Sequence, residues 1–162
     1  MATKVSMSFD LPFPAAAVRD QMRSPDLIHA SEKSRGALEV DVKDLASDDT
    51  RHEYEIMVVN YGRGIKGEDR SKRETSYTTV KWELSRHLRL WTWKGEHPVN
   101  LTGEDIITET PNGSRLSMTA TIDVKIPVVG RIVAKKLKEG FEENWPNYAK
   151  LVEEFCAKQP RE

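Results

Sequence analysis

Residues 114–157 read SRLSMTATIDVKIPVVGRIVAKKLKEGFEENWPNYAKLVEEFCA. In the second part of this run, from Pro127 to Ala157, apolar residues recur every three or four positions, the spacing of one stripe along an α-helix. About 28 helical residues at about 1.5 Å each predict a helix about 42 Å long. Such a helix needs an equally long apolar surface beneath its stripe. The stripe consists of Val129, Val133, Leu137, Phe141, Trp145, Tyr148, Val152 and Phe155.

The first part of the run, from Ser114 to Ile126, alternates between apolar and polar residues. Alternation with a period of two is typical of a β-strand with one buried face. About 13 residues at about 3.3 Å each predict a strand about 43 Å long, which matches the length of the helix. The sequence therefore predicts a long helix lying across a curved antiparallel sheet. The inward positions of the strand are Leu116, Met118, Ala120, Ile122, Val124 and Ile126.

The rest of the chain supplies further strands and two short helices. Pro12 and Pro14 end the first strand, and Pro14 suits the first turn of a helix. The Pro111-Asn112-Gly113 sequence is a strong hairpin signal. The predicted order is one strand, two helices, six strands and the long helix, in one α+β domain that spans residues 1–162. The elements before residue 114 are strands at 4–11, 37–45, 51–60, 75–84, 88–94 and 101–109 and helices at 15–22 and 25–32.

Composition excludes several classes of partner. The formal net charge of −1 gives no attraction to nucleic acid or to acidic membranes as a whole. The single cysteine, Cys156, rules out an internal disulfide, fits a reducing cytoplasm and is interpreted as a small filler near the helix end. No run approaches the roughly 18 apolar residues of a membrane span, and no apolar signal segment follows Met1. We expect a cytoplasmic protein without an integral membrane segment.

A glycine-rich and basic segment separates two of the strands, from Tyr61 to Glu74. It includes the run Gly62-Arg63-Gly64-Ile65-Lys66-Gly67, which matches neither a dinucleotide-binding nor a Walker pattern. The segment is longer than most hairpin connections. We predict a flexible, solvated loop at the mouth of the fold. The alternative is a mobile lid, or a basic patch that meets a phosphorylated or lipid headgroup.

No catalytic constellation stands out. His29, His52, His87 and His97 lack the spacing of metal ligands, and no HExxH, CxxC or GxSxG sequence is present. His52 is assigned to the polar side of its strand, and His87 and His97 to turns. The sequence thus predicts no metal, no cofactor and no catalytic residue, and favours a protein that is not an enzyme.

Two short runs carry a resemblance to a known family. The run Pro14-Ala15-Ala16-Ala17-Val18, followed by Ser24-Pro25-Asp26-Leu27, resembles the first helix pair of the START / Bet v 1-like (SRPBCC) superfamily, although Ser24 replaces the usual acidic residue. The run from Val124 to Gly130 is similar to the strand-to-helix crossing of the uncharacterised bacterial DUF2505-like branch. The order of elements is that of the helix-grip fold.

The resemblance implies a cavity between the concave sheet and the last helix, which would hold an apolar ligand such as a lipid, sterol, quinone or polyketide. Tyr54, Tyr148 or Trp82 would orient the ligand's polar end. The same side chains could instead pack a dry core. The predicted lining is Tyr54, Ile56, Val58, Trp82, Leu84, Met118, Ala120, Ile122, Val133, Leu137, Phe141, Trp145 and Tyr148.

Three functional interpretations remain open at this point. The first is binding or carriage of a small hydrophobic molecule. The second is an enzyme resembling polyketide cyclases or aromatases, which would need polar groups that converge in the cavity. The third is an interaction module with a filled core, which would use the Arg63–Arg73 segment or exposed Trp91 and Trp93.

Overall fold

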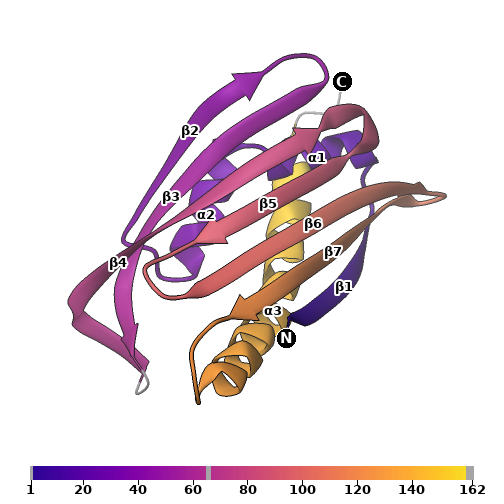
Figure 1. Ribbon diagram of the computed structural model, residues 1–162. Helices are drawn as coiled ribbons and strands as arrows, with labels where there is room; N and C mark the ends of the chain where they lie inside the picture. The colour runs from indigo at the N-terminus through magenta and orange to yellow at the C-terminus, as the bar shows by residue number, and fades with distance from the viewer. Residues whose placement is uncertain (1, 65–66, 160–162) are drawn as a thin grey trace.

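The long strand and the long helix predicted at the C-terminal end are both present in the computed structural model, which describes residues 2–64 and 67–159. They belong to a seven-stranded antiparallel sheet with three α-helices on one face (Figure 1). The elements are β1 (Thr3–Leu11), α1 (Ala15–Met22), α2 (Pro25–Ser34), β2 (Glu39–Ser47), β3 (Arg51–Gly64), β4 (Gly67–Glu83), the short 3-10 helix η1 (Leu84–Arg86), β5 (Leu88–Lys94), β6 (Val99–Thr110), β7 (Gly113–Val124) and α3 (Gly130–Ala157).

The sheet joins the two ends of the chain. The strand order is β1-β7-β6-β5-β4-β3-β2, so the first strand pairs with the last and every other neighbour is joined in sequence. Helix α3 contacts β1, β7, α1 and α2. This is the predicted helix-grip arrangement: β7 feeds directly into α3, which folds back over the concave face of the sheet (Figure 1).

The strand register aligns the inward side chains in rows that cross the sheet. One row runs Tyr54, Val80, Trp91, Gly103 and Ala120, from β3 to β7. Gly103 is required in this row because a Cβ there would clash with the Trp91 ring, which lies over the glycine. Trp91 is only 9% exposed, so the expectation of an exposed Trp91 is wrong. The residue faces the core because it shares its strand parity with inward neighbours.

The segment from Tyr61 to Glu74 was predicted to be a flexible loop, and this prediction is wrong. It is not a loop, because β3 and β4 continue to Gly64 and Gly67, which pair with each other. Ile65 and Lys66, which were part of the predicted loop, lie outside the described residues. Within the described ranges, neither β2 nor β5 pairs with this ribbon beyond Asn60, so its backbone bonds come only from its own two strands. Antiparallel pairing satisfies the backbone whatever the side chains are, and so overrides the poor strand propensity of glycine and charged residues.

The predicted end of the strand at Leu84 is also wrong. Leu84 belongs to η1 rather than to the preceding strand, yet it remains buried with 8% exposure. Helix α2 also runs two residues further than predicted, to Ser34, and β7 ends at Val124 rather than at Ile126. Such shifts at element ends are ordinary and leave the faces of the elements unchanged.

Helix α3 runs without a break through Pro146. Its buried residues are Trp145, Ala149, Val152 and Cys156, all in the C-terminal half. The burial of Cys156 confirms its interpretation as a filler residue. Among the residues that the structure describes, no helix is both long and apolar enough to cross a membrane.

Candidate functional site

A buried ion pair lies on the concave face in the middle of the sheet. Arg89 on β5 and Asp105 on β6 are register partners, and the Arg89 Nη1 donates to Asp105 Oδ2 at 2.8 Å. The Asp105 side chain is completely buried, whereas 15% of the Arg89 side chain remains exposed. Removing two charges from water is costly, and a close, hydrogen-bonded pair offsets much of that cost.

This ion pair was not predicted from the sequence, although strand parity indicates that both residues face inward. Arg89 alternates in phase with Trp91 and Trp93, and Asp105 alternates in phase with Leu101 and Ile107. Charged residues in strands usually face solvent, so Arg89 and Asp105 were not considered as buried residues. A strict period of two would have placed both charges inward.

The electrostatics of the pair keep Arg89 charged. Burial acts to lower the pKa of Arg89, but Asp105, Tyr54 and Tyr148 together outweigh it, so that the pKa lies above its ordinary value. Burial raises the pKa of Asp105, and Arg89 acts against that shift. Within the described part of the chain, Asp105 Oδ1 and Arg89 Nε have no hydrogen-bond partner. Buried polar atoms of this kind are normally satisfied by water or by a ligand.

Two tyrosines lie close enough to affect the pair. Burial raises the pKa of Tyr148 well above its ordinary value, although the charge of Arg89 acts against that shift. Tyr148 therefore keeps its proton and can donate a hydrogen bond. The Trp82 Nε1 donates to the Tyr54 hydroxyl at 3.1 Å, which fixes the orientation of that phenol. The three residues predicted to orient a polar group, Tyr54, Tyr148 and Trp82, thus lie around a charged pair that was not predicted.

The assignment of His52 to the polar side of its strand is wrong. His52 is buried, not exposed, because it shares its strand parity with Tyr54, and the two rings lie 4.8 Å apart. The Arg23 Nε donates to His52 Nδ1 at 3.1 Å, and His52 Nε2 lies 2.9 Å from Asp44 Oδ1. In this tautomer Nε2 carries the proton. His52 therefore links α1 to β2 and β3, and has a structural role.

All of the predicted lining residues lie in or against one hydrophobic core. Phe141 faces the sheet, since its ring centroid lies 6.2 Å from that of Trp91 and 5.1 Å from that of Trp145. Their role in binding a ligand stays a prediction. The buried members are Tyr54, Ile56, Val58, Trp82, Leu84, Met118, Ala120, Ile122 and Trp145, and the partly buried members are Val133, Leu137, Phe141 and Tyr148.

Some of the partly buried apolar residues lie on the N-terminal half of α3 and on β5. Trp93 lies on the inward face of β5, in the row that also contains Ile56 and Leu101, yet it is only partly buried. Leu137 and Phe141, on the inward side of α3, are partly buried as well. The four fully buried residues of α3 all lie in its C-terminal half, so the N-terminal half is the less completely covered of the two.

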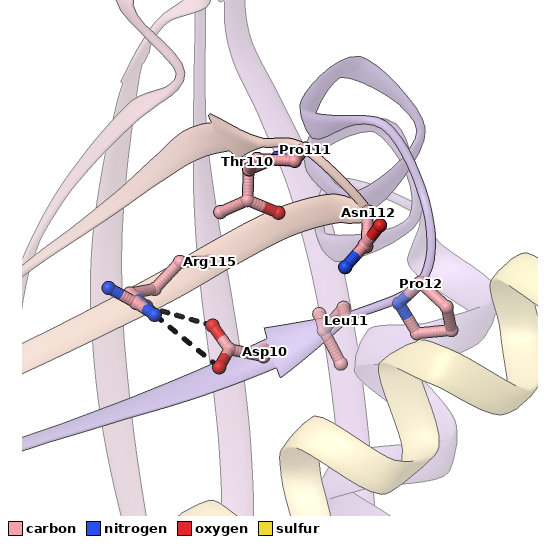
Figure 2. Close-up of a pocket in the computed structure, with 7 residues that line it drawn as sticks. All are labelled: Asp10, Leu11, Pro12, Thr110, Pro111, Asn112 and Arg115. Atoms are coloured by element: carbon pink, nitrogen blue, oxygen red, sulfur yellow. Dashed lines mark hydrogen bonds and ion pairs between the residues drawn. The ribbon is translucent and has the colours of Figure 1, made fainter.

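A separate pocket of about 390 Å³ lies at the end of β1 and the β6–β7 turn (Figure 2). It contains none of the predicted lining residues. Its charged groups are the Arg115–Asp10 pair, with an N–O distance of 2.8 Å and with both side chains more than half exposed. Exposed pairs of this kind contribute little energy, and the described residues around the pocket offer no buried charge that would orient a ligand. It is lined by Asp10, Leu11, Pro12, Thr110, Pro111, Asn112 and Arg115.

The described residues contain no group of three or more His, Cys, Asp or Glu side chains that could hold a metal ion. The candidate site consists of the buried polar groups around Arg89 and the apolar side chains beside them. Arg89 and Tyr148 can donate hydrogen bonds, and the surrounding side chains can bury apolar surface.

Comparison with known proteins identifies the fold. No protein-family model and no curated protein sequence matches the chain. Among solved structures, the Zhui aromatase/cyclase from Streptomyces sp. R1128 superposes with a TM-score of 0.70 at 13% identity, covering 99% of this chain and 97% of that one. A START superfamily protein from Mycobacterium smegmatis gives 0.59 at 17% identity, covering 96% and 97%. TTHA0849 from Thermus thermophilus gives 0.65 at 17% identity, covering 98% and 100%.

These likenesses extend over nearly the whole chain, and at such low identity they concern the fold alone. The resemblance to the DUF2505-like branch stays a prediction. The order of the elements, the antiparallel sheet and the long C-terminal helix all agree with the solved structures. The chain has the helix-grip fold of the START superfamily.

Proposed function

We propose that this protein binds a small hydrophobic molecule between the concave face of the sheet and α3, with the polar end of the ligand toward Arg89. The main support is the difference in exposure between the two side chains of the buried ion pair. Asp105 is completely buried, yet Arg89, on a central strand, keeps 15% of its side chain exposed. The partly buried Trp93, Leu137 and Phe141 supply an apolar wall beside the same helix.

The charges define which polar group fits. Asp105 already compensates the charge of Arg89, so a ligand carboxylate would meet the negative partner as well as the positive one. A neutral carbonyl or hydroxyl can accept a hydrogen bond from Arg89 or from Tyr148 without that repulsion. Among the predicted ligand classes, the oxygen of a quinone, a polyketide, a sterol or a neutral lipid meets this requirement. Burial of the apolar part would contribute about 25 cal/mol per Å².

The proposal is tested by native mass spectrometry of the purified full chain and by titration with the neutral fluorescent probe N-phenyl-1-naphthylamine. Leu137→Trp adds volume on the inward side of α3 and should weaken probe binding at least tenfold, since the ring would occupy the ligand's place. Ile132→Trp is the matched control, because Ile132 lies on the outward side of the same helix with 58% exposure. If neither method detects a bound molecule, or if both variants lose probe affinity equally, the proposal is rejected.

A second candidate, an enzyme of the aromatase/cyclase type, is favoured by the convergence of Arg89, Asp105, Tyr54 and Tyr148. Asp105 Oδ1, which has no hydrogen-bond partner among the described residues, can accept the proton that leaves the carbon next to a carbonyl. A protonated tyrosine and a buried guanidinium can then stabilise the negative charge that develops on the carbonyl oxygen. The assay follows deuterium exchange at the acidic carbon of a 1-aryl-1,3-diketone by NMR. If the candidate is correct, Arg89→Gln abolishes the accelerated exchange while the diketone still binds. Binding without any acceleration leaves carriage as the function.

The free, buried thiol of Cys156 supports a reducing compartment, and we include a cytoplasmic location in the proposal. Fractionation of the native host, with detection of the full chain, tests this location. Recovery of the protein from an oxidising compartment would contradict it.

A further inference from the structure

The corner between β7 and α3 exposes two apolar side chains. The Val128 side chain is 100% exposed, and its φ of 69° lies in the left-handed region. That region is unfavourable for a β-branched residue. One turn later, Ile132 is 58% exposed. Neither exposed side chain is stabilised by burial in the fold, and the backbone of Val128 is strained as well.

The same corner is rich in basic side chains. The first turn of α3 contains no acidic residue, and its described residues include no side-chain cap. Cations near a helix N-terminus are opposed by the helix dipole, so this placement is also unfavourable for the isolated protein. Among the ion pairs of the described residues, none involves these cations. The exposed basic residues are Lys125, Arg131, Lys135 and Lys136.

The helix presents these groups together. At about 100° per residue, the four residues 131, 132, 135 and 136 fall within an arc of about 140° on the outward side of α3. Val133 and Leu137 point the opposite way, toward the core. Acidic residues on the helix begin only at Glu139. Figure 1 shows this start of α3 at the end of the helix remote from α1 and α2. We call Lys125, Val128, Arg131, Ile132, Lys135 and Lys136 the α3-start patch.

We propose that the α3-start patch docks the protein onto a membrane surface that contains anionic phospholipids. Val128 and Ile132 can insert at the boundary between lipid headgroups and acyl chains. The basic side chains beside them can meet the lipid phosphates. The free amides at the uncapped helix start add donors for the same phosphates. The patch contains four cations, and the first acid on the same side of the helix, Glu139, lies one turn beyond them, so the charge complementarity is confined to the start of the helix. This inference stands whether or not the interior binds a ligand.

The test is flotation of the purified full chain with vesicles of phosphatidylcholine alone or mixed with phosphatidylglycerol. We expect binding to the mixed vesicles at low salt, and weaker binding at high salt because salt screens the charges. Ile132→Glu should reduce binding at least tenfold. The double change Lys135→Gln and Lys136→Gln should reduce it by about 25-fold, at about fivefold for each basic residue.

Leu45→Glu is the matched control, because Leu45 is an equally large apolar residue with 50% exposure on β2, outside the patch. Circular dichroism and thermal unfolding confirm that each variant is folded. Equal binding to both kinds of vesicle, loss of binding in Leu45→Glu, or full competition by inorganic phosphate would each overturn the proposal. A patch that binds an acidic protein but no vesicle would overturn it as well.

Discussion

The two halves of α3 have the same apolar spacing but different burial. In the C-terminal half, Trp145, Ala149, Val152 and Cys156 are all at most 6% exposed. In the N-terminal half, all of which the structure describes, no residue is buried, and Val133, Leu137 and Phe141 are only partly covered. Spacing along a helix therefore predicts which side faces the protein, while burial depends on what lies opposite.

The packing partners account for the difference. The Cys156 thiol lies 3.8 Å from the Ala17 carbonyl oxygen, so the C-terminal half is enclosed between α1 and the sheet. Phe141 instead reaches across to Trp91 on the concave face. The C-terminal half thus holds the fold together, and the N-terminal half remains available for the two proposed binding functions.

The largest expected effect comes from Trp145→Ala. Truncation of a large, 5% exposed aromatic residue leaves a cavity and should lower the free energy of unfolding by about 3–5 kcal/mol. Urea denaturation measures this value. Ile132→Ala, at an exposed position of the other half, should change it by less than about 0.5 kcal/mol. Similar losses in the two variants would remove the distinction between the halves.

A matched pair of valines gives an intermediate effect. Val152 is 0% exposed and Val133 is partly buried, so Val152→Ala should cost about 2 kcal/mol and Val133→Ala less than about 1 kcal/mol. The change in side chain is identical, and only the surroundings differ. Both values come from the same urea titration. An equal or larger cost at Val133 would show that the N-terminal half is also packed for stability.

The smallest effect concerns thiol chemistry and pH. Burial raises the pKa of Cys156 to about 11, and Glu153 adds to that shift. Since the thiolate is the reactive form, native Cys156 should be alkylated by iodoacetamide much more slowly than Leu137→Cys in a Cys156→Ala background. Because the folded pKa is raised, this group's contribution to stability is complete below about pH 9 and is lost as the pH rises through about 11. Comparable labelling rates at pH 8 would contradict the enclosed environment of Cys156.

The element order and most inward positions followed from periodicity, because burial of one face imposes a period on the residues that form it. Phe141 and Trp82 illustrate this for helix and strand. The ribbon from Tyr61 to Glu74 was not predicted, since backbone pairing across a hairpin does not depend on an apolar pattern. His52 was misassigned, although its parity with Tyr54 was available in the sequence.

By itself, the sequence determined that a long strand and a long helix join their apolar sides, because periods of two and of about 3.6 leave no other face to bury. Only the tertiary structure decided that Arg89 meets Asp105, since the register between β5 and β6 places them opposite each other. It also decided that the two ends of one uniform stripe differ in burial. Burial is a property of the neighbours that the fold assembles, which spacing within one element does not encode.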